Sequence, residues 1–325
     1  MLLRLIKKSK NMEKVIFDTN AYLDLIEIVP ETDVDSFMND VRAKETSQGI
    51  TVLLHPVVMK EIISHLHNNT NATRFQLYLK ANNAMYLHSK YNGVNNIAAS
   101  IELQLAKSYW NKSLSRYEES SKAILQVSEI FAKAFPALPN QVPENLKYIH
   151  DMVEQGEEGF VNAIRDFLKK IDPNFDGVHV FKADKNKRKN AWKSLNTNDM
   201  DLYTAMAFIM ITQQLLWNEK QISTMKNFNM LISKGKMLIK ECPEAIYLQR
   251  WIYQQCFSSN GFNLFKHRNF VWDMHLMFYA GFHKINGEPL TFVTSDKAML
   301  EAVKAISSTN KNVINIEEYK QKINL

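Results

Sequence analysis

Four carboxylates in this sequence lie where a divalent metal site can be built. Asp18 and Asp296 each follow a short apolar run, and Glu61 and Asp273 lie in helix-like segments close to such runs. Mg²⁺ and Mn²⁺ are hard cations that prefer oxygen ligands, and clustered carboxylates repel one another unless a cation neutralises them. The four acids therefore predict a Mg²⁺ or Mn²⁺ site, on the condition that the two ends of the chain fold into one domain.

Each of these acids also has a simpler explanation. An Asp directly after a strand is usually a turn residue or a helix N-cap, and caps explain Asp273 and Asp296 equally well. A helical glutamate such as Glu61 often faces solvent. The order and the local contexts of the four acids nevertheless favour one shared site over four separate explanations.

A second choice exists for the third acid of this set. Asp199 and Asp201 open another helical pattern and are an alternative to Asp273. We favour Asp273 because it directly precedes the predicted strand that leads to Asp296.

The residues around the first two acids predict alternating strands and helices. Strands are expected at 14–18 and 50–55, and helices at 20–28 and 33–47. A further helix opens at Pro56, because proline fits the first helical turn. This alternation is typical of a parallel α/β sheet, in which ligand sites form beyond the carboxyl ends of the strands.

The segment from about 67 to 267 predicts a different structure. It contains no convincing strand run and few glycines, and its apolar positions recur at three- and four-residue spacing. Helices are expected near 72–90, 97–134, 143–170, 198–217, 219–238 and 241–257.

The α/β pattern returns at about residue 268. The expected elements are a helix at Asp273, a strand at 290–294, a helix at 296–305 and a strand at 312–316. The predicted architecture is therefore a discontinuous α/β domain, made of 12–66 and 268–325, with an all-helical insertion at 67–267. Insertion into a loop is tolerated when the ends of the inserted segment lie close together.

Composition limits the class of protein. The chain has 325 residues, of which 46% are hydrophobic, so a substantial core is expected. The net charge of +6 suits a partner with a phosphate backbone, although it is also compatible with an ordinary basic protein. Two cysteines without metal-site spacing and no stretch of roughly 18 apolar residues favour a cytoplasmic protein without a membrane span.

A basic segment near residue 187 is a candidate nucleic-acid contact. We expect a loop in which Phe181 and Trp192 flank the cations, so that the loop grips phosphates and stacks on unpaired bases. The alternative is a solvated linker, as most charge runs are. The basic side chains are Lys182, Lys185, Lys187, Arg188, Lys189 and Lys193.

The acids lie in segments that resemble the motifs of the PIN-domain nucleases. That family has an Asp after the first strand, an acid on the helix after the second strand, an Asp opening a later helix, and an Asp after a strand that ends in Thr-x-Asp. The matching segments are VIFDTNAYLDL at 15–25, LLHPVVMKEIISHL at 53–66, VWDMHLMFYAG at 271–281 and LTFVTSDKAML at 290–300. All four occur in the family's order.

The resemblance implies a three-layer α/β/α fold and a Mg²⁺- or Mn²⁺-dependent nuclease, usually acting on RNA. It assigns metal binding and catalysis to the four acids, and it assigns the shaping of the site by hydrogen bonds to Asn20 and Thr294. The expected reaction is hydrolysis of phosphodiester bonds within the RNA, which leaves a 5′-phosphate and a 3′-hydroxyl.

The long insertion departs from the small members of this family. It predicts a more elaborate substrate or a regulatory protein partner, and an exposed apolar groove on the insertion would support the partner. Two rival functions stay open: a structure-specific DNA nuclease with a related core, and a non-catalytic module that binds RNA or scaffolds a complex. The complete acid set argues against the second rival, because a non-catalytic module has no need of four repelling carboxylates.

Overall fold

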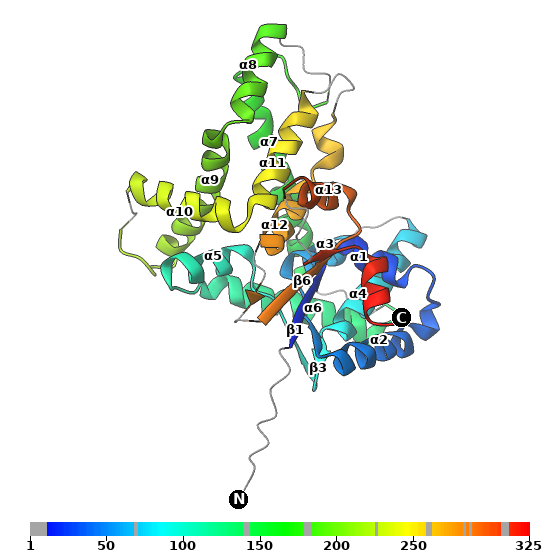
Figure 1. The fold of residues 1–325 in the computed structure, drawn as a ribbon. Helices are drawn as coiled ribbons and strands as arrows, with labels where there is room; N and C mark the ends of the chain where they lie inside the picture. The colour runs from blue at the N-terminus through cyan, green and yellow to red at the C-terminus, as the bar shows by residue number, and fades with distance from the viewer. Residues whose placement is uncertain are drawn as a thin grey trace, which may run out of the picture.

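A small parallel sheet joins the two ends of the chain (Figure 1). Strand β1, Glu13–Phe17, lies between β2, Ile50–Val52, and β6, Glu288–Val293, and is parallel to both. Strand β7, Val313–Ile314, pairs with β6 in parallel, and the short β5, Lys284–Ile285, pairs with β6 in the antiparallel direction. The predicted parallel α/β sheet made from both ends of the chain is confirmed.

This sheet belongs to a computed structural model of the chain, which is mostly helical. The residues that it describes are 12–67, 71–138, 144–178, 184–224, 227–257, 262–281, 284–285, 288–306 and 312–325.

The helices outside residues 67–267 flank the sheet or follow its strands. They are α1 Thr19–Ile26, η1 Glu31–Asp33, α2 Val34–Gln48, α3 Pro56–Ser64, α12 Phe270–Gly281, α13 Lys297–Ile306 and α14 Ile316–Lys322. Within 67–267 the helices are α4 Ala72–His88, α5 Ile101–Trp110, α6 Ser115–Ala134, α7 Asn145–Lys169, α8 Lys185–Leu195, α9 Asn198–Asn218, α10 Phe228–Glu241, α11 Pro243–Cys256 and η2 Leu264–His267.

The prediction that residues 67–267 are wholly helical is wrong at one place. Strands β3, Lys90–Tyr91, and β4, Val94–Asn95, form an antiparallel hairpin. Asn92 and Gly93 form its turn with φ of 50° and 82°, the left-handed conformation that an Asn-Gly pair favours in two-residue hairpins. The chain then returns to the edge of the sheet, where a parallel bridge joins Leu54 to Ile97.

Two further expectations are corrected by local backbone conformation. The single helix expected at 97–134 is divided into α5 and α6, because Asn111 ends α5 with a left-handed φ of 53°. The basic loop is instead helix α8. Its N-cap is Asp184, whose carboxylate accepts from the backbone amides of Asn186 and Lys187 at 2.9 Å each.

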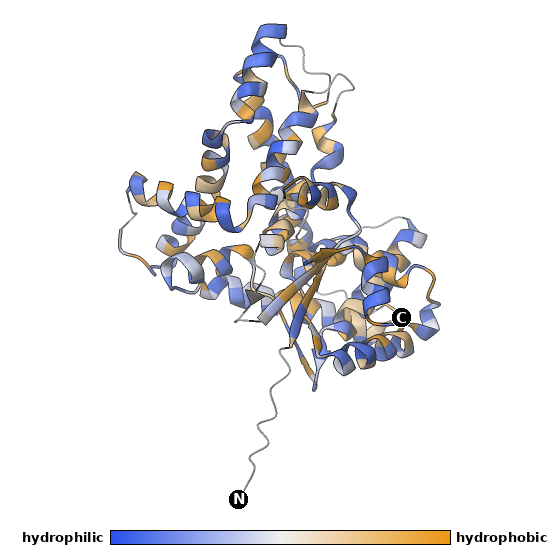
Figure 2. Cartoon of the chain, in the orientation of Figure 1, coloured by the Kyte–Doolittle hydropathy of each residue, from blue (hydrophilic) through white to orange (hydrophobic). Residues whose placement is uncertain are grey.

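One continuous hydrophobic core includes side chains from the sheet and from the helices of 67–267. Phe17 of β1, Phe131 of α6, Ile252 of α11 and Phe278 of α12 all belong to it and are buried. Apolar colour is concentrated on the central strands, whereas α8 is largely hydrophilic (Figure 2). The division into a core at 12–66 and 268–325 and an insertion at 67–267 therefore stays a prediction.

Helices α7 and α12 approach each other very closely. A Cβ atom on Gly156 of α7 would lie 2.8 Å from the Trp272 ring of α12, a separation that real side chains do not adopt. Glycine is thus required where the two helices meet. This contact fixes the part of α7 that follows Gly156 next to the start of α12.

A buried carboxylate that does not line the cavity described below is fully paired. Glu45 of α2 has no exposed surface, and its Oε1 lies 2.7 Å from Nε2 of His88. The hydroxyl of Tyr319 donates to the same oxygen at 2.5 Å, and the hydroxyl of Tyr91 donates to Oε2 at 3.3 Å. This Glu45 cluster ties α2 to α4, to β3 and to the C-terminal helix α14.

The two cysteines, Cys242 and Cys256, are buried and unpaired at the ends of α11. None of the helices in the described ranges combines the length and apolarity that a bilayer crossing requires.

Candidate active site

Asp18 lies directly beyond the carboxyl end of β1 and caps α1. Its backbone amide donates to the carbonyl of Val293 at 2.9 Å, so it is held next to the end of β6. Its Oδ1 accepts from the amide of Ala21 at 2.5 Å, and its Oδ2 accepts from the Thr294 hydroxyl. Burial raises its pKa to about 7; these hydrogen bonds oppose the rise, and the nearby charge of Asp296 adds to it.

Thr294 connects Asp18 to the last of the four acids. Its hydroxyl accepts from the amide of Asp296 at 3.0 Å while it donates to Asp18. The Asp296 carboxylate in turn accepts from the amide of Met299 at 2.9 Å at the start of α13. Asp18 and Asp296 are therefore both helix caps, and one threonine links the two cap positions.

Glu61 is brought to Asp18 by helix α3. Its Oε2 accepts from the hydroxyl of Thr19 at 2.7 Å, the residue that follows Asp18. Burial raises the pKa of Glu61 to about 8, the Thr19 hydrogen bond opposes this rise, and the charges of Asp18 and Glu157 add to it. Glu61 is partly buried, and it lines a cavity while it accepts the Thr19 hydrogen bond.

Asp273 completes the set from the first turn of α12. Its side chain is 7% exposed, and its Oδ2 has no hydrogen-bond partner among the described residues. Burial raises its pKa far above the ordinary value, and the charges of Asp296, Glu61 and Asp18 raise it further. The structure therefore brings all four predicted acids into one electrostatically coupled group.

The alternative third acids lie elsewhere. Asp201 forms an ion pair with Arg250, and Asp199 is exposed at the start of α9. Neither contributes to the raised pKa of Asp273. The structure groups Asp273, rather than Asp199 or Asp201, with the other three acids.

The four acids have the residue types that bind a divalent cation, but their side-chain positions are not those of a formed metal site. All four donors are carboxylates, which is the chemistry that Mg²⁺ and Mn²⁺ prefer, and the buried unpartnered oxygen of Asp273 needs either a proton or a cation. In the described ranges, however, no three His, Cys, Asp or Glu side chains already stand close enough to hold one metal ion. Both oxygens of Asp18, Oε2 of Glu61 and Oδ1 of Asp296 accept hydrogen bonds from protein donors. The residue types fit the cation, although the described side chains do not stand in a ready-made binding geometry.

A cavity of about 680 Å³ opens beside three of the acids, Asp18, Glu61 and Asp273. Asn20, predicted to shape the site, also lines it. Asp296 is not among its lining residues, and it contacts the cavity acids only through Thr294 and through its charge. A volume of this size accommodates a few linked nucleotides or a small molecule.

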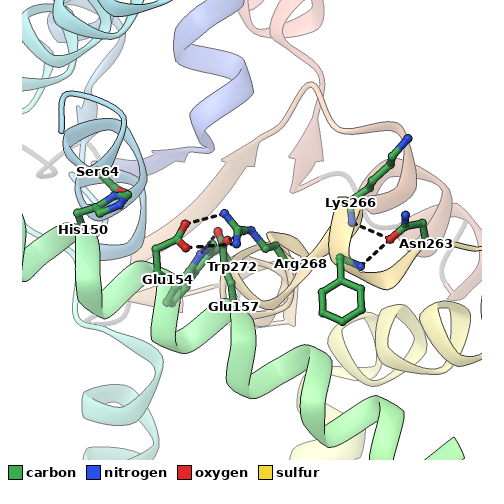
Figure 3. Close-up of polar contacts among 9 residues, drawn as sticks. Ser64, His150, Glu154, Glu157, Asn263, Lys266, Arg268 and Trp272 are labelled. Atoms are coloured by element: carbon green, nitrogen blue, oxygen red, sulfur yellow. Dashed lines mark hydrogen bonds and ion pairs between the residues drawn. The ribbon is translucent and has the colours of Figure 1, made fainter. Parts of the chain in front are cut away.

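Helix α7 contributes carboxylates that the sequence did not predict. Arg268 forms ion pairs with Glu154 at 2.6 Å and with Glu157 at 2.7 Å (Figure 3). Glu157 also accepts from the indole of Trp272 at 3.2 Å, next to Asp273 in α12. Burial raises the pKa of Glu157, and the charge of Arg268 opposes this rise. The only sequence signal was Gly156, which allows α7 to approach α12.

The cavity also carries stacked aromatic and histidine rings. The ring of His65 stacks on Tyr78 at 4.0 Å between centroids, and the ring of His67 stacks on His150 at 4.6 Å. Nδ1 of His150 lies 3.0 Å from Oγ of Ser64, which it faces in Figure 3. The cavity thus combines acids from the end of β1 and from α3, α7 and α12 with aromatic rings and with Arg74 of α4.

The predicted basic contact is remote from this cavity. Lys182 and Phe181 lie outside the described residues, whereas the remaining basic side chains belong to α8. In Figure 1, α8 is at the end of the helical region furthest from the sheet, and none of its described residues lines the cavity. Nucleic-acid binding by α8 stays a prediction.

Helix α9 exposes large apolar side chains. Tyr203, Met210 and Trp217 are 63%, 51% and 48% exposed and recur at seven-residue spacing. These exposed side chains do not by themselves form the apolar groove that would support a protein partner, so the partner stays a prediction.

The chain was compared with protein-family models, curated proteins and solved structures, and none of them matches it.

Proposed function

We propose that this protein is a metal-dependent ribonuclease that cleaves within single-stranded RNA. One observation carries the proposal: Asp273 Oδ2 is buried without a partner in the described part of the chain, and three other acids raise its pKa. Burying such a group costs free energy, and a stable fold gains nothing from it. Groups of this kind are typical of sites that bind a ligand.

The protein would hold the metal through Asp18, Glu61, Asp273 and Asp296. When bound, Mg²⁺ or Mn²⁺ supplies an activated water and neutralises charge on the phosphate oxygens. The proposed core is three-layered and PIN-like. The parallel order β2, β1, β6 and β7 supports this proposal, because Asp18 follows β1 and Asp296 comes shortly after β6. Thr19 and Thr294 hold Glu61 and Asp18 in place by hydrogen bonds.

Other lining residues of the cavity would bind the RNA. The guanidinium of Arg74 lines the cavity and forms no ion pair within the described ranges, so it is available for a phosphate. Rings such as Tyr78 and His67 offer faces for unpaired bases. Arg268 is already paired with Glu154 and Glu157, so it supports the cavity wall instead.

The test is cleavage of labelled single-stranded RNA and DNA with Mn²⁺, Mg²⁺ or EDTA. Wild type should cut RNA in a metal-dependent manner, and Asp18→Asn and Asp296→Asn should both lose this cutting. Asp199→Asn is the matched control on α9 and should cut at the wild-type rate. Products with 5′-phosphates from a circular RNA would establish internal cleavage.

Three outcomes would contradict the proposal in different ways. Preferential cutting of branched or single-stranded DNA would favour the DNA-nuclease rival. Absence of cutting together with absence of metal binding by calorimetry would favour the RNA-binding scaffold. Equal cutting by wild type and both acid variants would place the activity outside these acids.

A further inference from the structure

A second cavity of about 720 Å³ lies beside the edge of β2, between the sheet, α5 and α6. Its lining residues and those of the acid cavity have no member in common. The two cavities therefore offer separate surfaces for ligands.

The second cavity is basic. Lys107 of α5, Lys112 of the following turn and Lys122 of α6 line it, are exposed, and form no ion pair within the described residues. Lys14 of β1 adds a half-buried fourth amine. Glu118 is the one carboxylate among the described residues that line this cavity. The excess of positive charge suits a ligand with several negative charges close together.

The uncharged lining offers both apolar and polar contacts. Leu53, Ile97 and Leu103 present apolar surface, which can cover one face of a planar ring. Asn96 and Gln104 present amides, which can donate to and accept from a base edge or a ribose. Lysines around a pocket with apolar and amide contacts match a nucleotide better than a purely inorganic anion.

We propose that this second cavity binds a nucleoside triphosphate, with the base against the apolar residues and the phosphates between Lys107, Lys112 and Lys122. The volume lies within the range of small-molecule sites, roughly 300–1,000 Å³. Each lysine places a mobile point charge on a flexible stem, which suits a phosphate chain. The inference does not depend on the nuclease proposal, because no acid of the first cavity takes part.

The experiment is isothermal titration of the full chain with ATP, GTP, CTP and UTP in EDTA, which removes metal binding at the acid cavity. At least one nucleotide should bind saturably at one site. The double variant Lys107→Gln/Lys112→Gln should weaken it by at least about tenfold, since each charge-assisted hydrogen bond to a phosphate supplies a large part of the affinity. Lys236→Gln/Lys240→Gln on α10, which lines neither cavity, is the matched control and should bind as wild type does.

Thermal unfolding checks that the variants are folded, and Asp18→Asn should keep the nucleotide affinity whether or not it cuts RNA. The proposal is overturned if none of the four nucleotides binds, or if the Lys107→Gln/Lys112→Gln variant binds unchanged. It is also overturned if tripolyphosphate binds as tightly as the nucleotides, or if a short RNA displaces them. The last outcome would make the cavity part of a nucleic-acid path.

Discussion

The buried carboxylates of Glu45 and Asp273 differ in how completely their oxygens are hydrogen-bonded. Glu45 is surrounded by His88, Tyr319 and Tyr91, which satisfy both of its oxygens. Asp273 leaves one oxygen unpartnered within the described residues and lies near three further acids. Glu45 thus holds structural elements together, whereas Asp273 has a buried oxygen without a partner among the described residues, which is the oxygen that our proposal assigns to the metal.

The largest expected effect is on catalysis. Asp273→Asn should lower RNA cleavage at least about 1,000-fold, because removing one ligand of a catalytic metal removes several kcal/mol of transition-state stabilisation. Glu45→Gln should cleave within about threefold of wild type, since the Glu45 cluster lies outside the cavity. The measurement is single-turnover cleavage with Mn²⁺. Similar losses in both variants would remove the contrast between the two groups.

For the free energy of unfolding, we expect the substitution at Glu45 to have the larger destabilising effect and the substitution at Asp273 the smaller one. Glu45→Ala should destabilise the protein by about 3 kcal/mol, because His88 and Tyr319 lose a buried partner. Asp273→Asn should not destabilise the metal-free protein at pH 7, since burial beside three other acids raises the pKa of the native carboxyl and an amide removes the cost of burying that charge. Urea unfolding monitored by circular dichroism measures both. A larger loss in Asp273→Asn would assign it a structural role.

The acid cavity also predicts how stability depends on pH. The pKa of Asp18 is raised from 3.8 to about 7, so between these values the unfolded chain releases a proton that the folded chain keeps. Stability should therefore fall as pH rises from about 4 to about 7, and Glu61 extends the fall to about 8.

Asp18→Asn isolates this contribution. At pH 8 it should be more stable than metal-free wild type by on the order of 3 kcal/mol, and at pH 4 the two should be equal. Mn²⁺ should stabilise wild type at pH 8 more than it stabilises this variant. Differential scanning calorimetry in EDTA tests the first part, and a pH-independent difference would contradict it.

A smaller effect is expected where α7 meets α12. Gly156→Ala places a methyl group against Trp272 and should cost about 2 kcal/mol, while it moves Glu157 away from Asp273. Gly159→Ala on the same helix meets nothing within 4 Å and should stabilise by roughly 0.5–1 kcal/mol, the helix-propensity difference. Thermal unfolding of the Gly156→Ala and Gly159→Ala variants measures both effects. If Gly156→Ala stabilises the protein as Gly159→Ala does, then helix propensity outweighs close packing at Gly156.

The smallest effect concerns α8. Neutralising Lys185, Lys187, Arg188 and Lys189 together should flatten the salt dependence of binding to a long RNA, and the slope should change by up to about 0.7 for each phosphate that is no longer neutralised. Binding of a trinucleotide should keep its slope, because α8 is remote from the cavity (Figure 1). An unchanged slope with long RNA would leave α8 without a role in binding.

The sequence predicted the four acids because each depends on a local pattern. Asp18 and Asp296 follow strands, and Asp273 opens a helix, so parallel strands bring them to one edge. It did not predict Glu157 or Arg268, because their positions depend on the packing of α7 against α12.

Two errors had signals that were present in the chain. The Asn-Gly pair at 92–93 is typical of a hairpin turn, and it lies between the helices expected at 72–90 and 97–134, where strands of two residues are too short for periodicity to detect. Asp184 before a run of Lys and Arg is typical of a helix start, yet the charge run favoured a loop interpretation. The division of 97–134 depended on one left-handed residue, Asn111, which periodicity does not detect.

The pairing of β1 with β6 also has a consequence for the time at which the site forms. Asp18 and Thr294 are 276 residues apart along the chain, so their contact closes one of the longest loops available to it. During synthesis, β1 and Asp18 emerge about 270 residues before β6, so the sheet cannot be completed until β6 and β7 have been made. A fragment that ends before α12 would carry Asp18 and Glu61 alone, so the nascent chain lacks a complete acid group until Asp296 has been added.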